Sequence, residues 1–151
     1  MTPIVISNDV LAEARTFFEE CGAKGCEGTA MIAMPTKTGA TRLVIPEQCA
    51  GAAPHCWVEV TEAGKLALAV TLAADERFVS RIHSDPKEAF HSPADDANPA
   101  ITHEGALSIV VPYFGRGLAH GLDACAVLRR TGGRWVNLPP GTGRDQYVVA
   151  R

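Results

Sequence analysis

The sequence predicts a single α/β domain. Its 151 residues are enough for one hydrophobic core, and no repeat or linker divides them. A segment near the start shows helical periodicity, and several short apolar runs separated by turn residues follow it. Hydrophobic residues make up 46% of the chain and charged residues 21%, which is ordinary for a globular domain.

A helix is predicted to begin after Ser7-Asn8-Asp9, whose side chains are good N-caps. Apolar residues then recur with a 3.6-residue period as far as Cys21, and Gly22 is expected to end the helix. Two strands should follow, a buried one at 29–34 and a second at 41–45, joined by a short turn.

The segment 62–74 fits two patterns. Its leucine and valine residues alternate as in a strand, but the alanines between them suit a buried helix. The length of the segment and the nearby Thr61 favour the helix. A third strand is predicted just before it, at 57–60.

The second half of the chain predicts a strand at 78–83 and a loop of about twenty residues from Ser84 to His103. A loop of this length in a small domain is usually functional or disordered. A core strand at 107–111 should follow, stopped by Pro112.

Two further runs, 122–128 and 135–138, predict a hairpin that turns at Thr131-Gly132-Gly133. We expect residues 1–138 to form the domain and residues 139–151 to be a loosely held C-terminal tail.

Composition excludes several classes of function. The net charge of −3 gives no basic footprint for nucleic acid, and no apolar run approaches the roughly 20 residues that span a bilayer. The first residues lack the pattern of a signal peptide. The five cysteines form no Cys-x-x-Cys pair, so we expect reduced, largely buried thiols in a cytoplasmic protein.

Potential metal ligands gather after the strand at 78–83. His83 and Asp85 are two residues apart, so in a strand their side chains point to the same face. They could hold one ion together, and Asp95 could complete the shell from the far side of the loop. A hydrolytic site needs about three such ligands, an open position and a base outside the shell.

Glu27 is the candidate base. It lies at the entry of the first strand, between Gly25-Cys26 and Gly28-Thr29. These small neighbours would let a substrate backbone come close.

These residues resemble the signature of the JAMM or MPN-domain metalloproteases. That signature is a glutamate on an early strand, then His-Ser/Thr-His-Pro, then Ser-x-x-Asp several residues later. The counterparts here are Glu27, His83-Ser84-Asp85-Pro86 and Ser92-Pro93-Ala94-Asp95. The resemblance covers most of the chain, and 107–112 is similar to bacterial members, several of which are encoded with ubiquitin-activating-like and conjugating-like enzymes.

The resemblance implies an MPN-like, cytidine-deaminase-like fold, with a mixed sheet flanked by helices. It implies that His83 and Asp95 bind zinc, with Asp85 at the position of the third ligand. Glu27 would be the general base, and Ser92 would hydrogen-bond the developing oxyanion. Family members cut the peptide or isopeptide bond after the C-terminal glycine of ubiquitin or a ubiquitin-like protein.

The chain departs from the signature in two ways. Asp85 replaces the second motif histidine, and the gap to Ser92 is one residue shorter than usual. Aspartate can bind zinc, but a His-Asp-Asp shell is more anionic and makes the metal a weaker Lewis acid. Asp85 therefore leaves three interpretations open: a working variant, a natural loss of activity, or an engineered inactivating substitution.

Simpler interpretations exist for each residue. A His-x-Asp pair can be a surface hydrogen bond, Glu27 a solvated strand-end carboxylate, and Ser92 the start of a helical turn. His91 is the nearest spare imidazole, whereas His55, His103 and His120 have no partner spacing.

The leading hypothesis is a zinc isopeptidase or processing protease in a bacterial ubiquitination-like pathway. Its partners would be the tail of a ubiquitin-like protein and the activating and conjugating enzymes. The main alternative is an inactive MPN-like scaffold that binds the same proteins. A third is trimming of a sulfur-carrier protein.

Overall fold

A computed structural model describes residues 2–37, 39–50, 58–90 and 101–151. The helical segments in these ranges are α1 (Asn8–Ala23), α2 (Glu62–Thr71), the 3-10 segment η1 (Tyr113–Ala124) and α4 (Thr142–Asp145). The strands are β1 (Ile4–Ile6), β2 (Thr29–Pro35), β3 (Arg42–Val44), β4 (Gln48–Ala50), β5 (Val58–Val60), β6 (Glu76–Ser84), β7 (Leu107–Val111), β8 (Ala126–Thr131), β9 (Arg134–Asn137) and β10 (Val148–Ala150).

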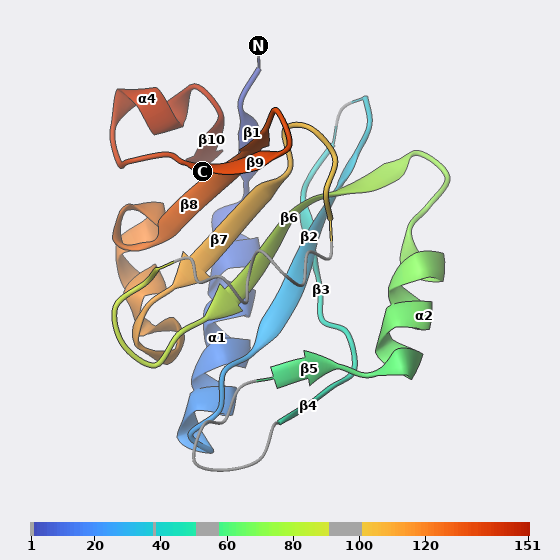
Figure 1. The fold of residues 1–151 in the computed structure, drawn as a ribbon, viewed down its shortest axis with the longest axis vertical. Helices are drawn as coiled ribbons and strands as arrows, with labels where there is room; N and C mark the ends of the chain where they lie inside the picture. Colours follow the sequence, from blue (N-terminus) through green and yellow to red (C-terminus); the bar gives the residue numbers. More distant parts are fainter. Residues whose placement is uncertain (1, 38, 51–57, 91–100) are drawn as a thin grey trace.

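The main sheet has the strand order β3-β2-β6-β7-β8-β9 (Figure 1). Strand β6 pairs antiparallel with β2 and parallel with β7, so the sheet is mixed, as predicted. The remaining strands form two small ribbons, the parallel pair β1–β10 and the antiparallel pair β4–β5.

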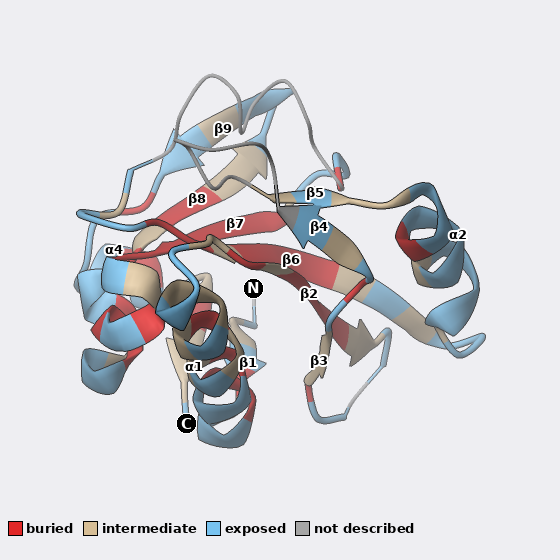
Figure 2. Cartoon of the chain, turned by 90° about the horizontal axis from the view of Figure 1, so that it is seen from below, coloured by how far each residue is buried: buried red, intermediate tan, exposed pale blue. Residues whose placement is uncertain are grey.

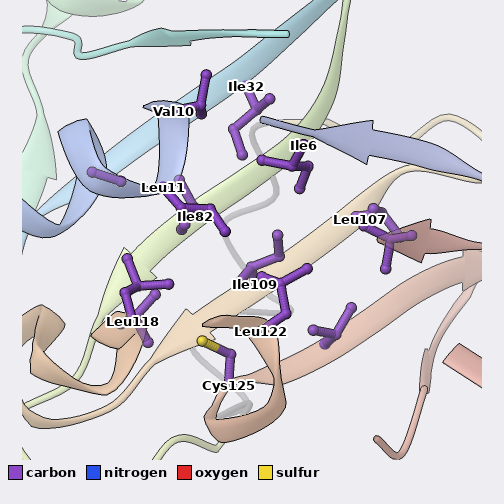
Figure 3. Packing of buried hydrophobic residues seen from close by; sticks show 14 of the residues in the cluster. Ile6, Val10, Leu11, Ile32, Ile82, Leu107, Ile109, Leu118, Leu122 and Cys125 are labelled. Atoms are coloured by element: carbon purple, nitrogen blue, oxygen red, sulfur yellow. The ribbon is translucent and has the colours of Figure 1, made fainter. Parts of the chain in front are cut away.

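Helix α1 covers one face of this sheet, as the view from below makes clear (Figure 2). Ser7 caps the helix as expected, because its Oγ accepts a hydrogen bond from the Val10 amide at 3.2 Å. The helix buries Val10, Leu11, Ala14 and Phe18. These side chains pack on Ile32, Ile82 and Ile109 of the central strands to form the main core (Figure 3).

A smaller apolar cluster lies on the opposite face of the central strands. It joins Met31, Ile101 and Ala106, with Phe78 and Trp135 packed against them. Met31 and Ile32 are neighbours in β2 but belong to different clusters, because successive side chains of a strand point to opposite faces. Both faces of the central strands are therefore covered.

Two predicted elements differ from the observed ones. Segment 62–71 is a helix, as expected, but it is not buried, since Leu66 is 70% and Val70 81% exposed. The first strand of the C-terminal hairpin begins at Ala126 rather than 122, because η1 continues to Ala124 and buries Leu122. An apolar run fits a buried 3-10 turn as well as a strand.

The expectation of a loosely held tail after residue 138 is wrong. Val148 is buried, and β10 pairs with β1. Arg144 is 3% exposed, and its guanidinium donates hydrogen bonds to the carbonyls of Leu138 at 2.8 Å, Leu122 at 2.7 Å and Cys125 at 3.2 Å. A single arginine thus holds the tail against the end of η1.

The expectation of five reduced, buried cysteines is also wrong. Cys26 is disulfide-bonded, and Cys49 is an exposed thiol. Cys125 does fit the prediction, since burial raises the pKa of its thiol to about 12. The disulfide removes one argument for a cytoplasmic location, which stays a prediction. Within the described ranges, no helix combines the length and the apolar character that a membrane span requires.

We predict that Arg144→Met lowers the free energy of unfolding by about 3 to 5 kcal/mol, because three buried carbonyls lose their donor. Urea unfolding followed by circular dichroism measures this change. Arg134→Met is the matched control, since Arg134 is exposed and should change stability by less than about 0.5 kcal/mol. Equal effects of the two substitutions would show that the tail does not depend on Arg144.

Candidate metal centre

His83 and Asp85 come together at the C-terminal end of β6. Their side chains lie on the same side of the strand, with His83 Nε2 3.7 Å from Asp85 Oδ1. Both are largely shielded, at 14% and 12% side-chain exposure. The pair predicted from the two-residue spacing is therefore formed, and it is not a solvated surface contact.

The backbone of Asp85 is fixed from two sides. Its amide donates to the Val111 carbonyl at 2.8 Å, and its carbonyl accepts from the Phe114 amide at 2.8 Å. Tyr113 and Phe114 adopt left-handed conformations, with φ of 57° and 53°. Such a conformation costs a non-glycine residue roughly 1–2 kcal/mol, so the turn into η1 is strained where it holds Asp85.

Ser84 ties the end of β6 to the start of β2. Its buried Oγ accepts from the Gly28 amide at 2.9 Å, and its own amide donates to the Gly28 carbonyl at 3.0 Å. A Cβ at Gly28 would come within 2.9 Å of the Phe17 ring and 3.0 Å of the Phe18 ring. Ser84 and Gly28 therefore hold the end of β6 close to the start of β2. Only a glycine fits at position 28 without displacing the Phe17 and Phe18 rings of α1.

The register brings the start of β2 next to the end of β6. Thr29 pairs directly with His83, and Gly28 lies opposite Ser84. Glu27 lies two residues before Thr29, outside β2, and is therefore close in the chain to the residue that pairs with His83. The Gln48 side chain secures this end of β2 by bonding both the amide and the carbonyl of Thr29 at 2.9 Å.

Glu27 also borders a pocket of about 270 Å³, which α1, β4 and β5 help to form. Helix α1 supplies Phe17, Cys21 and Lys24 to its wall, and β4 and β5 supply Gln48 and Val58. Glu27 therefore lies next to a space that a substrate segment could enter.

His83 and Asp85 supply two of the ligands that a metal ion would need. Two ligands of a tetrahedral zinc ion at about 2.0–2.2 Å have donor atoms roughly 3.3–3.6 Å apart, close to the His83–Asp85 separation. In the part of the chain that the structure describes, no group of three His, Cys, Asp or Glu side chains converges on one point. The predicted third ligand, Asp95, and the predicted oxyanion donor, Ser92, lie outside the described residues.

One residue of this face was missed from the sequence. Arg81 is 6% exposed, its Nε donates to Ser108 Oγ at 2.9 Å, and its guanidinium lies 4.8 Å from the centre of the Trp135 ring. It precedes His83 by two residues, so it lies about 7 Å along the strand on the same face. The sequence signal that could have identified Arg81 is the presence of an arginine within an otherwise apolar strand.

The two other histidines that the structure describes lie away from the pair. His103 and His120 are exposed, in agreement with the expectation, and His55 and His91 lie outside the described residues. Trp135 is half-buried, as expected for a strand position.

Known proteins were compared with the chain by sequence and by structure. No protein-family model matches it. A protein of Sinorhizobium fredii named probable metalloprotease y4jG is 49% identical over 39 residues. These residues are 26% of this chain and 24% of the relative, so the match spans about a quarter of that protein.

Solved structures match over nearly the whole chain. A JAB1/MPN domain protein from Archaeoglobus fulgidus superposes with a TM-score of 0.52 at 14% identity, covering 90% of this chain and 97% of the other. A protein from Desulfitobacterium hafniense gives 0.52 at 10% identity, covering 98% and 93%. The chain therefore has the JAB1/MPN fold, and its predicted resemblance to the JAMM/MPN metalloprotease family is confirmed at the level of that fold and of the 39-residue match.

Proposed function

We propose that the protein is a zinc-dependent peptidase of the JAMM type that cleaves after the C-terminal glycine of a ubiquitin-like protein. The observation that carries the proposal is the shielded His83–Asp85 pair, with Glu27 two residues before the Thr29 that pairs with His83. The JAB1/MPN fold and the metalloprotease-named relative support the reaction class. The substrate rests on the resemblance of the motif to the family.

His83 and Asp85 would hold the zinc ion, with Asp95 as the third ligand. A bound zinc ion supplies Lewis acidity to the scissile carbonyl and to water. Glu27 takes the proton of the attacking water and passes it to the leaving amine, as a general acid–base residue does. Ser92 donates a hydrogen bond to the developing oxyanion.

Asp85 makes this centre more anionic than one with two histidines. With two carboxylates and one imidazole, the ligands neutralise the charge of a divalent ion. The buried guanidinium of Arg81 lies nearby on the same face and adds one positive charge. That charge offsets part of the negative charge of the two carboxylates.

The alternative is a catalytically silent scaffold that binds a ubiquitin-like protein or its ligation enzymes. The aspartate in place of the motif histidine is the specific observation in its favour. Metal content distinguishes the two, because a scaffold prepared without chelators would contain no stoichiometric zinc.

We predict that Glu27→Gln lowers the cleavage rate of a glycine-tailed ubiquitin-like fusion by about 100-fold or more, while zinc content stays at the wild-type level. A base outside the shell can be removed without releasing the ion. Cleavage is followed by mass spectrometry, and zinc by elemental analysis. Glu13→Gln, which makes the same charge change at an exposed position of α1 outside this pocket, is the control and should retain activity. A fall of zinc content in step with activity would make Glu27 a ligand.

We predict that Asp85→His raises zinc affinity and the cleavage rate, each by about tenfold or more, since a neutral imidazole makes the metal a stronger Lewis acid. Competition with a zinc chelator measures the affinity. Asp75→His, at an exposed turn, controls for an added histidine. If Asp85→His neither binds zinc more tightly nor cleaves faster, the centre is adapted to aspartate.

A further inference from the structure

A second pocket lies at the opposite end of β6. It has a volume of about 200 Å³ and is formed by β1, β6, β8, the segment before β7 and the turn before β10. Arg77, which lines it, is six residues before His83 on β6, so the two ends are about 20 Å apart. The pocket is therefore separate from the candidate metal centre.

Two arginines and a histidine supply much of the polar lining of this pocket. Arg77 comes from β6, His103 from the segment before β7 and Arg129 from β8. Burial lowers the pKa of His103, and the charge of Arg77 lowers it further. Both effects favour the neutral form of the His103 imidazole, so the positive charge of the pocket comes from Arg77 and Arg129.

Arg129 is held in place before any ligand arrives. Its guanidinium lies 4.7 Å from the centre of the Tyr147 ring, and Nη1 donates to Thr131 Oγ1 at 3.0 Å. Gly105 lies beside this guanidinium, since a Cβ there would be in ordinary contact with Nη2 at 3.4 Å. A stacked guanidinium loses less freedom on binding than a mobile one, and its fork matches phosphate and carboxylate groups.

In the described part of the chain, neither arginine of the pocket forms a salt bridge with a carboxylate. Among the described residues, salt bridges join Arg15 to Glu19 and Arg42 to Glu76, but none joins Arg77 or Arg129 to an acidic side chain. The one acidic lining residue, Glu104, accepts a hydrogen bond from the Gly132 amide at 3.0 Å, which draws its carboxylate toward the β8–β9 turn.

We propose that this pocket binds a small anionic molecule through a phosphate or carboxylate group placed between Arg77 and Arg129. Ile4, Val79 and Tyr147 line the same space and would contact the carbon part of the ligand. The site is independent of the proposed peptidase activity. It would give the domain a small-molecule ligand in addition to its protein substrate.

The test is a titration of the isotope-labelled full chain with inorganic phosphate, with acetate and, as a salt control, with sodium chloride, followed by NMR of backbone amides. We expect phosphate or acetate to shift the amides of Gly105 and Tyr147 in a saturable way, and chloride to leave them unchanged. A stronger response to phosphate identifies a phosphate ligand, and a stronger response to acetate a carboxylate.

Arg129→Gln and Arg77→Gln should each weaken this binding at least about tenfold. Arg134→Gln, an exposed arginine outside the pocket, should leave it unchanged. The proposal is overturned if the wild-type and Arg77→Gln/Arg129→Gln proteins respond alike, if chloride gives the same shifts, or if the shifts are confined to the amides from Ile82 to Asp85. The last result would place the anion at the metal centre instead.

Discussion

Strand β6 is hydrogen-bonded along both edges, antiparallel to β2 and parallel to β7, and the arrangement of the candidate site depends on this double pairing. The antiparallel register sets Thr29, two residues after Glu27, opposite His83. The parallel partner β7 ends at Val111, and the Val111 carbonyl accepts a hydrogen bond from the Asp85 amide. A slip of one residue in either pairing would turn His83 and Asp85 toward the core.

The same constraint explains the small and strained residues around the site. Gly28 lets β2 lie close to α1, and the Ser84 hydroxyl completes the bond to the Gly28 amide that the strand ladder leaves open. Tyr113 and Phe114 adopt left-handed conformations so that η1 can turn back and bond the Asp85 carbonyl. The roughly 1–2 kcal/mol that each conformation costs is offset by packing and hydrogen bonds elsewhere in the domain.

Much of this arrangement could be predicted from local patterns. The cap and period of α1, the apolar runs of β2 and β7 and the His-x-Asp spacing are properties of neighbouring residues, and the structure agrees with them. What was missed depends on contacts between distant segments. The pairing of β10 with β1 and the bonds of Arg144 to Leu122, Cys125 and Leu138 join residues that no local pattern relates. The exposure of α2 was missed because alanine and leucine suit buried and exposed helices alike. The roles of Glu27, Ser92, His83, Asp85 and Asp95 stay predictions.

The most direct test of the account is X-ray absorption spectroscopy at the zinc edge on protein loaded with one equivalent of zinc. The account predicts a shell of one imidazole nitrogen and carboxylate or water oxygens, without sulfur, because His83 and the aspartates are the ligands and the cysteines are not. It also predicts that His83→Gln removes the imidazole signal. Sulfur in the shell, or a spectrum that His83→Gln leaves unchanged, would contradict the assignment of the metal centre to the end of β6.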